Sequence, residues 1–463
     1  MKHMDFGDLL LTPVFIILFY YIFKRGRNKF ENPILKKYHL QAFWVKMIGS
    51  IFFIIFYGII TGGDSMGLYH TEGKNLYRLI LADFQNVEYL FKPGSEFDLH
   101  LVKEPYNAGY FGGEANFMLI RIDAIFSFIT FGRYAPINLI FAAIGFSGLW
   151  KLFLFFYYQN PKLHKQFATC ILFFPTVVFW SSGLLKDTLC IASLGWITYS
   201  LYEIMYHRRN ILKNMVLLSF FTYLLVIIKV YIILAYLPFL ILFIIFKNVK
   251  EVKSGFLKWL IAPALIILSI FVFSKAMSSF DNELGAYSID EVTTSISTLN
   301  AGLSQKTGRA DAASNFNLGT EYEESFFGLI KVAPYAVVAT FFRPFIWEAS
   351  KVTQMLAAIE SLFLIFFTLF ILFKTGPLRF IKIVLTNPLI MYCFMFAIVF
   401  GIFVGASTLN FGTLVRYKIP CLPFFAISLF LVYEKVKERA FQKSMGNAEL
   451  STTPNIDMVV SVT

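Results

Sequence analysis

The sequence has few charged residues, and this scarcity restricts the class of protein to which it can belong. Only 15% of its 463 residues are charged, whereas 57% are hydrophobic and Phe alone occurs 56 times. A soluble globular domain has about 25% charged residues and less than half apolar ones. The composition therefore excludes a disordered chain, a collagen, a coiled coil and a nucleic-acid-binding module. It predicts an all-α polytopic membrane protein.

Cysteine is also scarce, and its placement excludes two further kinds of structure. The four cysteines, Cys170, Cys190, Cys393 and Cys421, all lie within apolar runs and lack metal-ligand spacing. Neither a disulfide framework nor a zinc site is expected from such a pattern.

Apolar runs long enough to cross a membrane recur along the chain. A spanning helix needs about 20 mostly apolar residues, and no cleaved signal peptide is expected at the N-terminus because basic residues follow the first run. We expect about 11 transmembrane helices, two long external loops and helices on the membrane surface. The predicted spans are 8–23, 43–62, 135–158, 167–181, 185–206, 214–229, 231–247, 256–274, 352–374, 383–404 and 417–434.

The distribution of Lys and Arg between the loops predicts the orientation of the spans. The two long loops 63–118 and 275–325 contain 7 Lys or Arg residues together, whereas the short loops on the opposite side contain 22. Basic loops stay on the cytoplasmic side, so the N-terminus and both long loops are predicted to be external. The net charge of +12 is then a topology signal and does not indicate nucleic acid. The basic segments are 24–46, 159–166, 207–213, 247–254, 374–382 and 434–443.

The first long loop contains two segments that we interpret as helices lying on the outer membrane surface, 75–91 and 117–132. Counting 117–132 as a span would invert the orientation of everything that follows it. We expect residues 326–346 to dip into the membrane without crossing it. The predicted organisation is an extra N-terminal helix and basic linker over 1–42, a transmembrane module over 43–435 and a flexible cytoplasmic tail over 436–463.

Charged residues near the membrane gather on the predicted outer face. Asp64 follows the span 43–62 in the sequence Gly-Gly-Asp-Ser, and cations recur in four later outer turns. Each has an ordinary structural interpretation as a helix end, a turn or an interfacial anchor, and His70 is expected to be a surface histidine. The residues concerned are Lys186 with Asp187, Lys229, Arg343 with Glu348, and Arg416 with Lys418.

Taken together, these charges suggest a shared chemistry. Lys and Arg bind phosphate, Arg through a bidentate fork and Lys as a point charge. A carboxylate beside them can act as a general base toward a hydroxyl. Further acids in the first loop are Asp98, Glu104 and Glu114. The combination suggests a substrate with a lipid-linked phosphate and an acceptor hydroxyl.

This layout resembles the GT-C superfamily of polytopic membrane glycosyltransferases. The resemblance covers roughly residues 43–435 and rests on a span that leads into a long external loop with an acid near its start, on two surface helices, and on short paired spans around 173–187. It implies transfer of a sugar from a polyprenyl-phosphate donor to a glycan, lipid or protein acceptor at the outer face of the cell (inner) membrane. Asp64 would be the catalytic base, with no cofactor required, although a divalent metal would be compatible. The substrate-binding residues would be Arg343, Arg416, Lys418, Lys186, Lys229, Glu348 and Glu114.

Two other functions remain open. An O-antigen-type polysaccharide polymerase or ligase would also use outward arginines to bind a lipid pyrophosphate, but it would not need the carboxylate of Asp64. A transporter or flippase of a lipid-linked or anionic solute should have charged or broken helices at mid-membrane. Only Lys151 lies deep within a proposed span, which disfavours a transporter. A purely structural scaffold would not require cations on one face.

Overall fold

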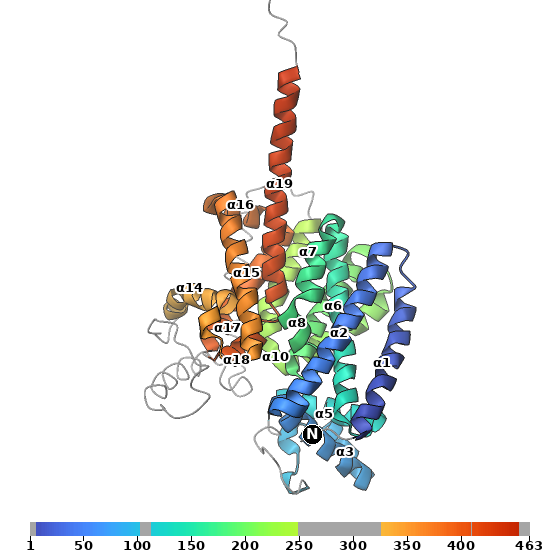
Figure 1. The fold of residues 1–463 in the computed structure, drawn as a ribbon. Helices are drawn as coiled ribbons and strands as arrows, with labels where there is room; N and C mark the ends of the chain where they lie inside the picture. Colours follow the sequence, from blue (N-terminus) through green and yellow to red (C-terminus); the bar gives the residue numbers. More distant parts are fainter. Residues whose placement is uncertain (1–5, 102–112, 249–325, 409, 453–463) are drawn as a thin grey trace, which may run out of the picture.

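The computed structural model describes residues 6–101, 113–248, 326–408 and 410–452, and most of these residues are helical (Figure 1). This confirms the expected all-α membrane architecture. In this part of the chain, six helices are long and apolar enough to cross a membrane, or seven if α18 and α19, which meet at a 62° bend, form one span. The larger number of about 11 stays a prediction, and the expected span 256–274 and loop 275–325 lie outside the described residues.

The main helices are α1 (Phe6–Arg27), α2 (Pro33–Ile55), α3 (Thr71–Ala82), α5 (Glu114–Thr130), α6 (Tyr134–Gln159), α7 (His164–Ala168), α8 (Pro175–Trp180), α9 (Lys186–Tyr202), α10 (Ile211–Asn248), α14 (Phe326–Phe342), α15 (Val352–Thr375), α16 (Pro377–Thr386), α17 (Pro388–Ser407), α18 (Phe411–Tyr417) and α19 (Leu422–Thr452). Short π-helical segments follow α2, as η1 (Phe56–Thr61) and η2 (Gly63–His70), and follow α7, as η7 (Thr169–Phe173). Several starts combine an Asn cap with a Pro in the first turn. In α2 and α17 the cap side chains of Asn32 and Asn387 accept from backbone N–H groups that have no partner within the helix.

Helix α6 defines the two ends of the bundle. At its start, the Tyr134 hydroxyl lies 2.8 Å from Ser65 Oγ. Near its end, the Tyr157 hydroxyl accepts from Asn32 Nδ2 at 2.8 Å. A helix of 26 residues is about 39 Å long, so these contacts lie on opposite sides of the bundle.

Contacts made by the other helices show which of these two ends of the bundle each helix end belongs to. Asp64, Asp187, Lys229 and Arg416 meet at the end where α6 begins, which we call the Asp64 end. Side chains from the ends of α6 and α10, from the middle of α19 and from the start of α17 surround one cavity at the opposite end, which we call the basic end. Figure 1 shows α3 and α5 near the start of α1 at the Asp64 end, and α16 at the basic end.

Helix α10 is two helices that fold back on each other at Lys229. This residue has φ −155° and ψ 77°, outside the helical range. Its ammonium contacts Asp187, at the start of α9, whereas the carbonyl of Ile244 accepts from Tyr206, which follows the end of α9. Residue 211 also follows the end of α9, so the chain must run along α9, reverse at Lys229 and return. The reversal falls where the sequence predicts an outer turn between two short spans.

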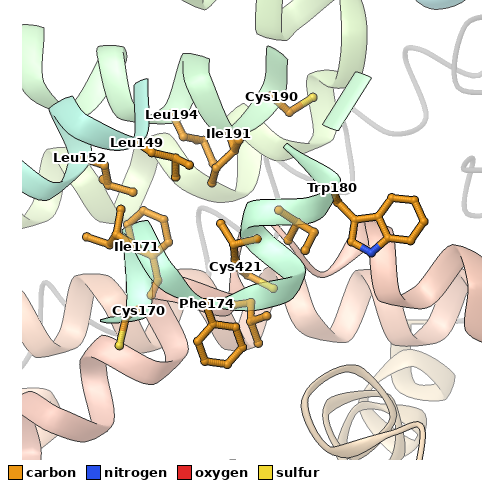
Figure 2. Packing of buried hydrophobic residues seen from close by; sticks show 14 of the residues in the cluster. Leu149, Leu152, Cys170, Ile171, Phe174, Trp180, Cys190, Ile191, Leu194 and Cys421 are labelled. Carbon is orange, nitrogen blue, oxygen red and sulfur yellow. The ribbon is translucent and has the colours of Figure 1, made fainter. Parts of the chain in front are cut away.

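The core forms where α6 and α9 pack closely through small residues. A Cβ added to Gly195 would lie 1.9 Å from the carbonyl oxygen of Gly148. Small residues are common where membrane helices pack because they let the backbones approach. Figure 2 shows apolar side chains of this core, with Leu149 of α6 near Ile191 of α9. Close packing holds the start of α9, and therefore Asp187, in a defined position.

The predicted span 167–181 is not one continuous helix. Phe174 has ψ 118° between η7 and α8, because the residue before a proline disfavours the helical conformation and Pro175 has no N–H to donate. The N–H and hydroxyl of Thr176 donate instead to the carboxylate of Glu360 on α15, at 2.8 and 2.5 Å. The Glu360 carboxylate therefore accepts from the donors that the break leaves inside the bundle.

The two predicted surface helices pack against each other. In the structure α3 ends at Ala82, where the Asp83 side chain accepts from Gln85 N and starts a 3-10 turn, so 75–91 is not a single α-helix. Helix α5 covers 114–130, close to the predicted 117–132. Leu76 and Ile80 of α3 pack with Phe117 and Ile120 of α5. Their placement on the membrane surface stays a prediction.

Residues at the two ends should react with impermeant reagents from opposite sides of the membrane. The four native cysteines are buried and free, so they should give little background. We expect a cysteine at Ser95 to be labelled from outside and one at Lys162 only from inside, since both positions are exposed. Labelling of both from the same side would contradict the two-ended topology.

Candidate functional site

Asp64 is presented by a sharp turn that glycine makes possible. Gly62 has φ +75° and Gly63 has φ +45°, a region that residues with a Cβ rarely adopt. A Cβ on Gly63 would also lie 2.6 Å from Tyr57 Cε1. The turn separates η1 from η2 and places Asp64 in the first turn of η2. Its carboxylate is 43% exposed, so a substrate hydroxyl can reach it.

Arg416 on α18 contacts Asp64, although the two residues lie far apart in the sequence. The Asn410 side chain caps α18 by accepting from Gly412 N and Thr413 N. Arg416 Nη1 donates to Asp64 Oδ2 at 2.7 Å, and its guanidinium lies 5.6 Å from the centre of the Trp180 ring. A cation over an aromatic face is attracted to it. Only 16% of the Arg416 side chain is exposed.

Asp187 is the buried centre of the site. Its side chain is fully buried, and its two oxygens accept from Lys229 Nζ at 2.7 Å and from Arg416 Nε at 3.2 Å. Lys229 also lies 4.1 Å from the centre of the Tyr417 ring. Acids and cations therefore alternate in the order Asp64, Arg416, Asp187, Lys229, which we call the charge chain. Each buried charge in it has a partner of opposite sign.

Arg343 forms a second ion pair next to the charge chain. Its Nε donates to both oxygens of Glu348 at 3.1 Å, and its guanidinium lies 5.2 Å from the Phe411 ring of α18. Lys418, two residues after Arg416, donates to the Arg343 carbonyl at 3.0 Å and to Ser361 Oγ at 3.3 Å. With 1% of its surface exposed, Lys418 connects α18 to α15 and is too buried to meet a substrate directly.

The remaining predicted site residues lie elsewhere or at the margin. Lys186 begins α9 next to Asp187 and is partly buried. Glu114 pairs with Arg121 at 3.2 Å within the first loop, so it supports that loop and is not part of the charge chain. Asp98 accepts from His100 N in a local turn. Glu104 lies outside the described residues.

Sequence reasoning missed two features of the site. Asp187 was expected to mark a helix start, and its role as the shared partner of two cations depends on residues far along the chain. Glu360 was overlooked although it lies inside the predicted span 352–374, where an acid is unusual. The expectation that Lys151 alone lies deep within a span is therefore wrong, since Glu360 and Lys46 are also buried in helices. Lys46 donates to Ser181 Oγ.

The site combines a partly exposed carboxylate with a positioned guanidinium. In the described part of the chain, no group of three or more His, Cys, Asp or Glu side chains is arranged to hold a metal ion. Arg has five N–H donors in a rigid fork, and Asp187 orients that fork by engaging Nε. An anion that displaced the Asp64 carboxylate would find Nη1 of Arg416 already oriented toward it.

Removing the charge of Asp187 should destabilise the protein far more than removing that of Asp64. Asp187→Asn leaves two largely buried cations without their shared acid, which should cost about 3–5 kcal/mol. Asp64→Asn breaks a partly exposed pair, which should cost about 1 kcal/mol or less. Thermal unfolding of the purified variants would measure both effects. An equal loss in the two variants would contradict the central place of Asp187.

The chain was compared with known proteins in three ways. No protein family, curated protein or solved structure matches it. The charge chain and the Arg343–Glu348 pair are therefore the features that indicate a function.

Proposed function

We propose that the protein transfers a sugar from a lipid-linked phosphate donor to an acceptor hydroxyl at the Asp64 end of the bundle. The observation that supports this most directly is the Asp64–Arg416 contact. It places a partly exposed acid and a phosphate-binding cation 2.7 Å apart. The proposal names a polyprenyl phosphate as the carrier and a glycan, lipid or protein as the acceptor. It also assigns the Asp64 end to the outer face of the cell membrane.

In the proposed reaction, the donor phosphate takes the place of the Asp64 carboxylate on Arg416. The acceptor oxygen forms a bond to the anomeric carbon while the bond from that carbon to the phosphate oxygen breaks. The hydroxyl proton passes to a carboxylate oxygen of Asp64. The electron pair of the broken bond stays on the phosphate, whose charge Arg416 stabilises.

Arg343 is proposed to bind the same phosphate or the carrier next to it. It lies beside α18 through Phe411, and Glu348 holds its guanidinium in a defined orientation. Lys418 is proposed as a positioning residue and no longer as a substrate ligand, because it is buried and joins the Arg343 backbone to α15. Lys186 and Lys229 would add positive potential around the leaving phosphate.

A transporter or flippase is the second candidate, and one observation favours it. The broken run of α7, η7 and α8 places Thr176 against the buried carboxylate of Glu360. Interrupted helices with buried charges are typical of transporter binding sites. A polymerase or ligase of the O-antigen type would also use Arg343 and Arg416, but without a catalytic role for Asp64.

Asp64→Asn should abolish most of the turnover without unfolding the protein. General-base assistance contributes typically 10²–10⁴-fold, so sugar transfer to an acceptor from a polyprenyl-phosphate sugar should fall by about that factor. Asp64→Glu should retain a little activity. The matched control is Asp83→Asn, a change at a turn acid of the same loop. Normal transfer by a folded Asp64→Asn variant would exclude this residue as the base.

Arg416→Lys should show whether the donor phosphate needs the guanidinium fork or only a positive charge at this position. Losing a charge-assisted contact costs about 1.5–3 kcal/mol, so Arg416→Ala should weaken donor use at least tenfold. The Lys variant should recover only part of it, because a fork becomes a point charge. The reconstituted Arg416→Ala and Glu360→Gln variants also test the transporter. Equal defects in flipping of a lipid-linked sugar, with no sugar transfer by any variant, would favour it.

A further inference from the structure

A cavity of about 380 Å³ lies at the basic end, away from the charge chain. It is bounded by the ends of α6 and α10, by the middle of α19 and by the start of α17. Ligand pockets in proteins have volumes of roughly 300–1,000 Å³, so this cavity can hold a small molecule or a lipid headgroup. None of its lining residues takes part in the proposed sugar transfer.

The polar lining of the cavity is suited to an anion. Two lysines, Lys247 and Lys435, line it together with three amide residues from two segments. Lys247 donates to Gln159 Oε1, and its Nζ lies 4.7 Å from the centre of the Tyr206 ring, so it is held in place. The three amides are those of Gln159, Asn160 and Asn387.

One acid also lines the cavity, and a second lies beside it. Glu434 lines it, and Lys435 pairs with Glu438 at 2.7 Å. Both side chains of that pair are at least 40% exposed, and such pairs contribute little to stability. A ligand of greater negative charge can therefore displace Glu438 from Lys435. With two cations against one acid in the lining, a dianionic or monoanionic group is favoured over a cation.

The rest of the lining is apolar and comes from the same helices. It includes Phe243, Phe246, Leu389 and Leu431. A cavity with cations at one part and aromatic and aliphatic walls at another matches a molecule with a charged head and a hydrocarbon body. Lysines at helix ends commonly reach the level of the lipid headgroups.

We propose that this cavity is a binding site for a phosphate group, carried either by an anionic membrane lipid or by a small soluble compound. The phosphate oxygens accept from Lys247 and Lys435, and the amides of Asn160 and Asn387 supply further N–H donors. The apolar wall contacts the acyl or glycerol part of a lipid. The site is independent of the proposed sugar transfer and holds whichever function the Asp64 end performs.

The test uses the full-length protein in detergent micelles and measures bound lipid by native mass spectrometry and ligand-induced shifts in thermal unfolding. The probes are a phosphatidylglycerol, a diacylglycerol with the same chains and no phosphate, and inorganic phosphate against chloride. We compare the native chain with Lys247→Gln/Lys435→Gln and with Lys435→Gln alone, which changes a partly exposed residue. Lys37→Gln is the matched control, because Lys37 is exposed on α2 near the same end and lies outside the cavity lining.

Phosphatidylglycerol should bind at least tenfold more tightly than the diacylglycerol, and the double variant should lose that difference while Lys37→Gln keeps it. Lysine-dependent binding of phosphatidylglycerol with no shift from inorganic phosphate supports a lipid site. A lysine-dependent shift from inorganic phosphate as well supports a site for the phosphate group itself. If the double variant does not fold, a severalfold loss of phosphatidylglycerol affinity in Lys435→Gln supports the proposal. Equal binding of the two lipids, or unchanged affinity in the folded variants, would overturn the proposal.

Discussion

The fully buried carboxylate of Asp187 is the constraint on which the Asp64 end depends. An unpaired charge in such a place would cost several kcal/mol, so two cations must reach it from other parts of the chain. Lys229 comes from the reversal of α10 and Arg416 from α18. Satisfying one carboxylate therefore ties together three elements that are far apart in sequence. The close contact of α6 with α9 at Gly148 and Gly195 keeps the acid where both cations can meet it.

The orientation of Arg416 follows from this arrangement. Because Asp187 engages Nε, Nη1 is directed toward Asp64, and the Trp180 ring covers the guanidinium. The partly exposed acid and the oriented cation thus differ in exposure. Asp64 stands on a glycine turn with access to its surroundings, whereas Arg416 is held by a buried partner. A site with one accessible acid and one positioned cation is suited to exchange a carboxylate for a phosphate.

Helices and their polarity could be predicted from local sequence, and their contacts could not. Apolar runs separated by Lys- and Arg-rich segments indicate where helices begin and end, and they placed Asp64, Lys229 and Arg416 on one face. Interruptions within a helix are harder to predict from the sequence. The run 167–181 is mostly apolar, so its interruption at Phe174 depends on Pro175 and on a carboxylate from α15. The sequence predicts that Glu114 contacts a substrate, whereas in the structure it pairs with Arg121.

The sequence by itself determined that the chain is a helical membrane protein and which charged residues share an end. Those features depend on hydrophobicity and charge along the chain, and each is readable within about 20 residues. Only the tertiary structure decided which charges are partners. Asp64 and Arg416 are 352 positions apart, and Lys418 is buried while its neighbour Arg416 faces the site. Compensation of a buried charge is a contact between distant segments, so it depends on how the helices pack and leaves no local pattern in the sequence.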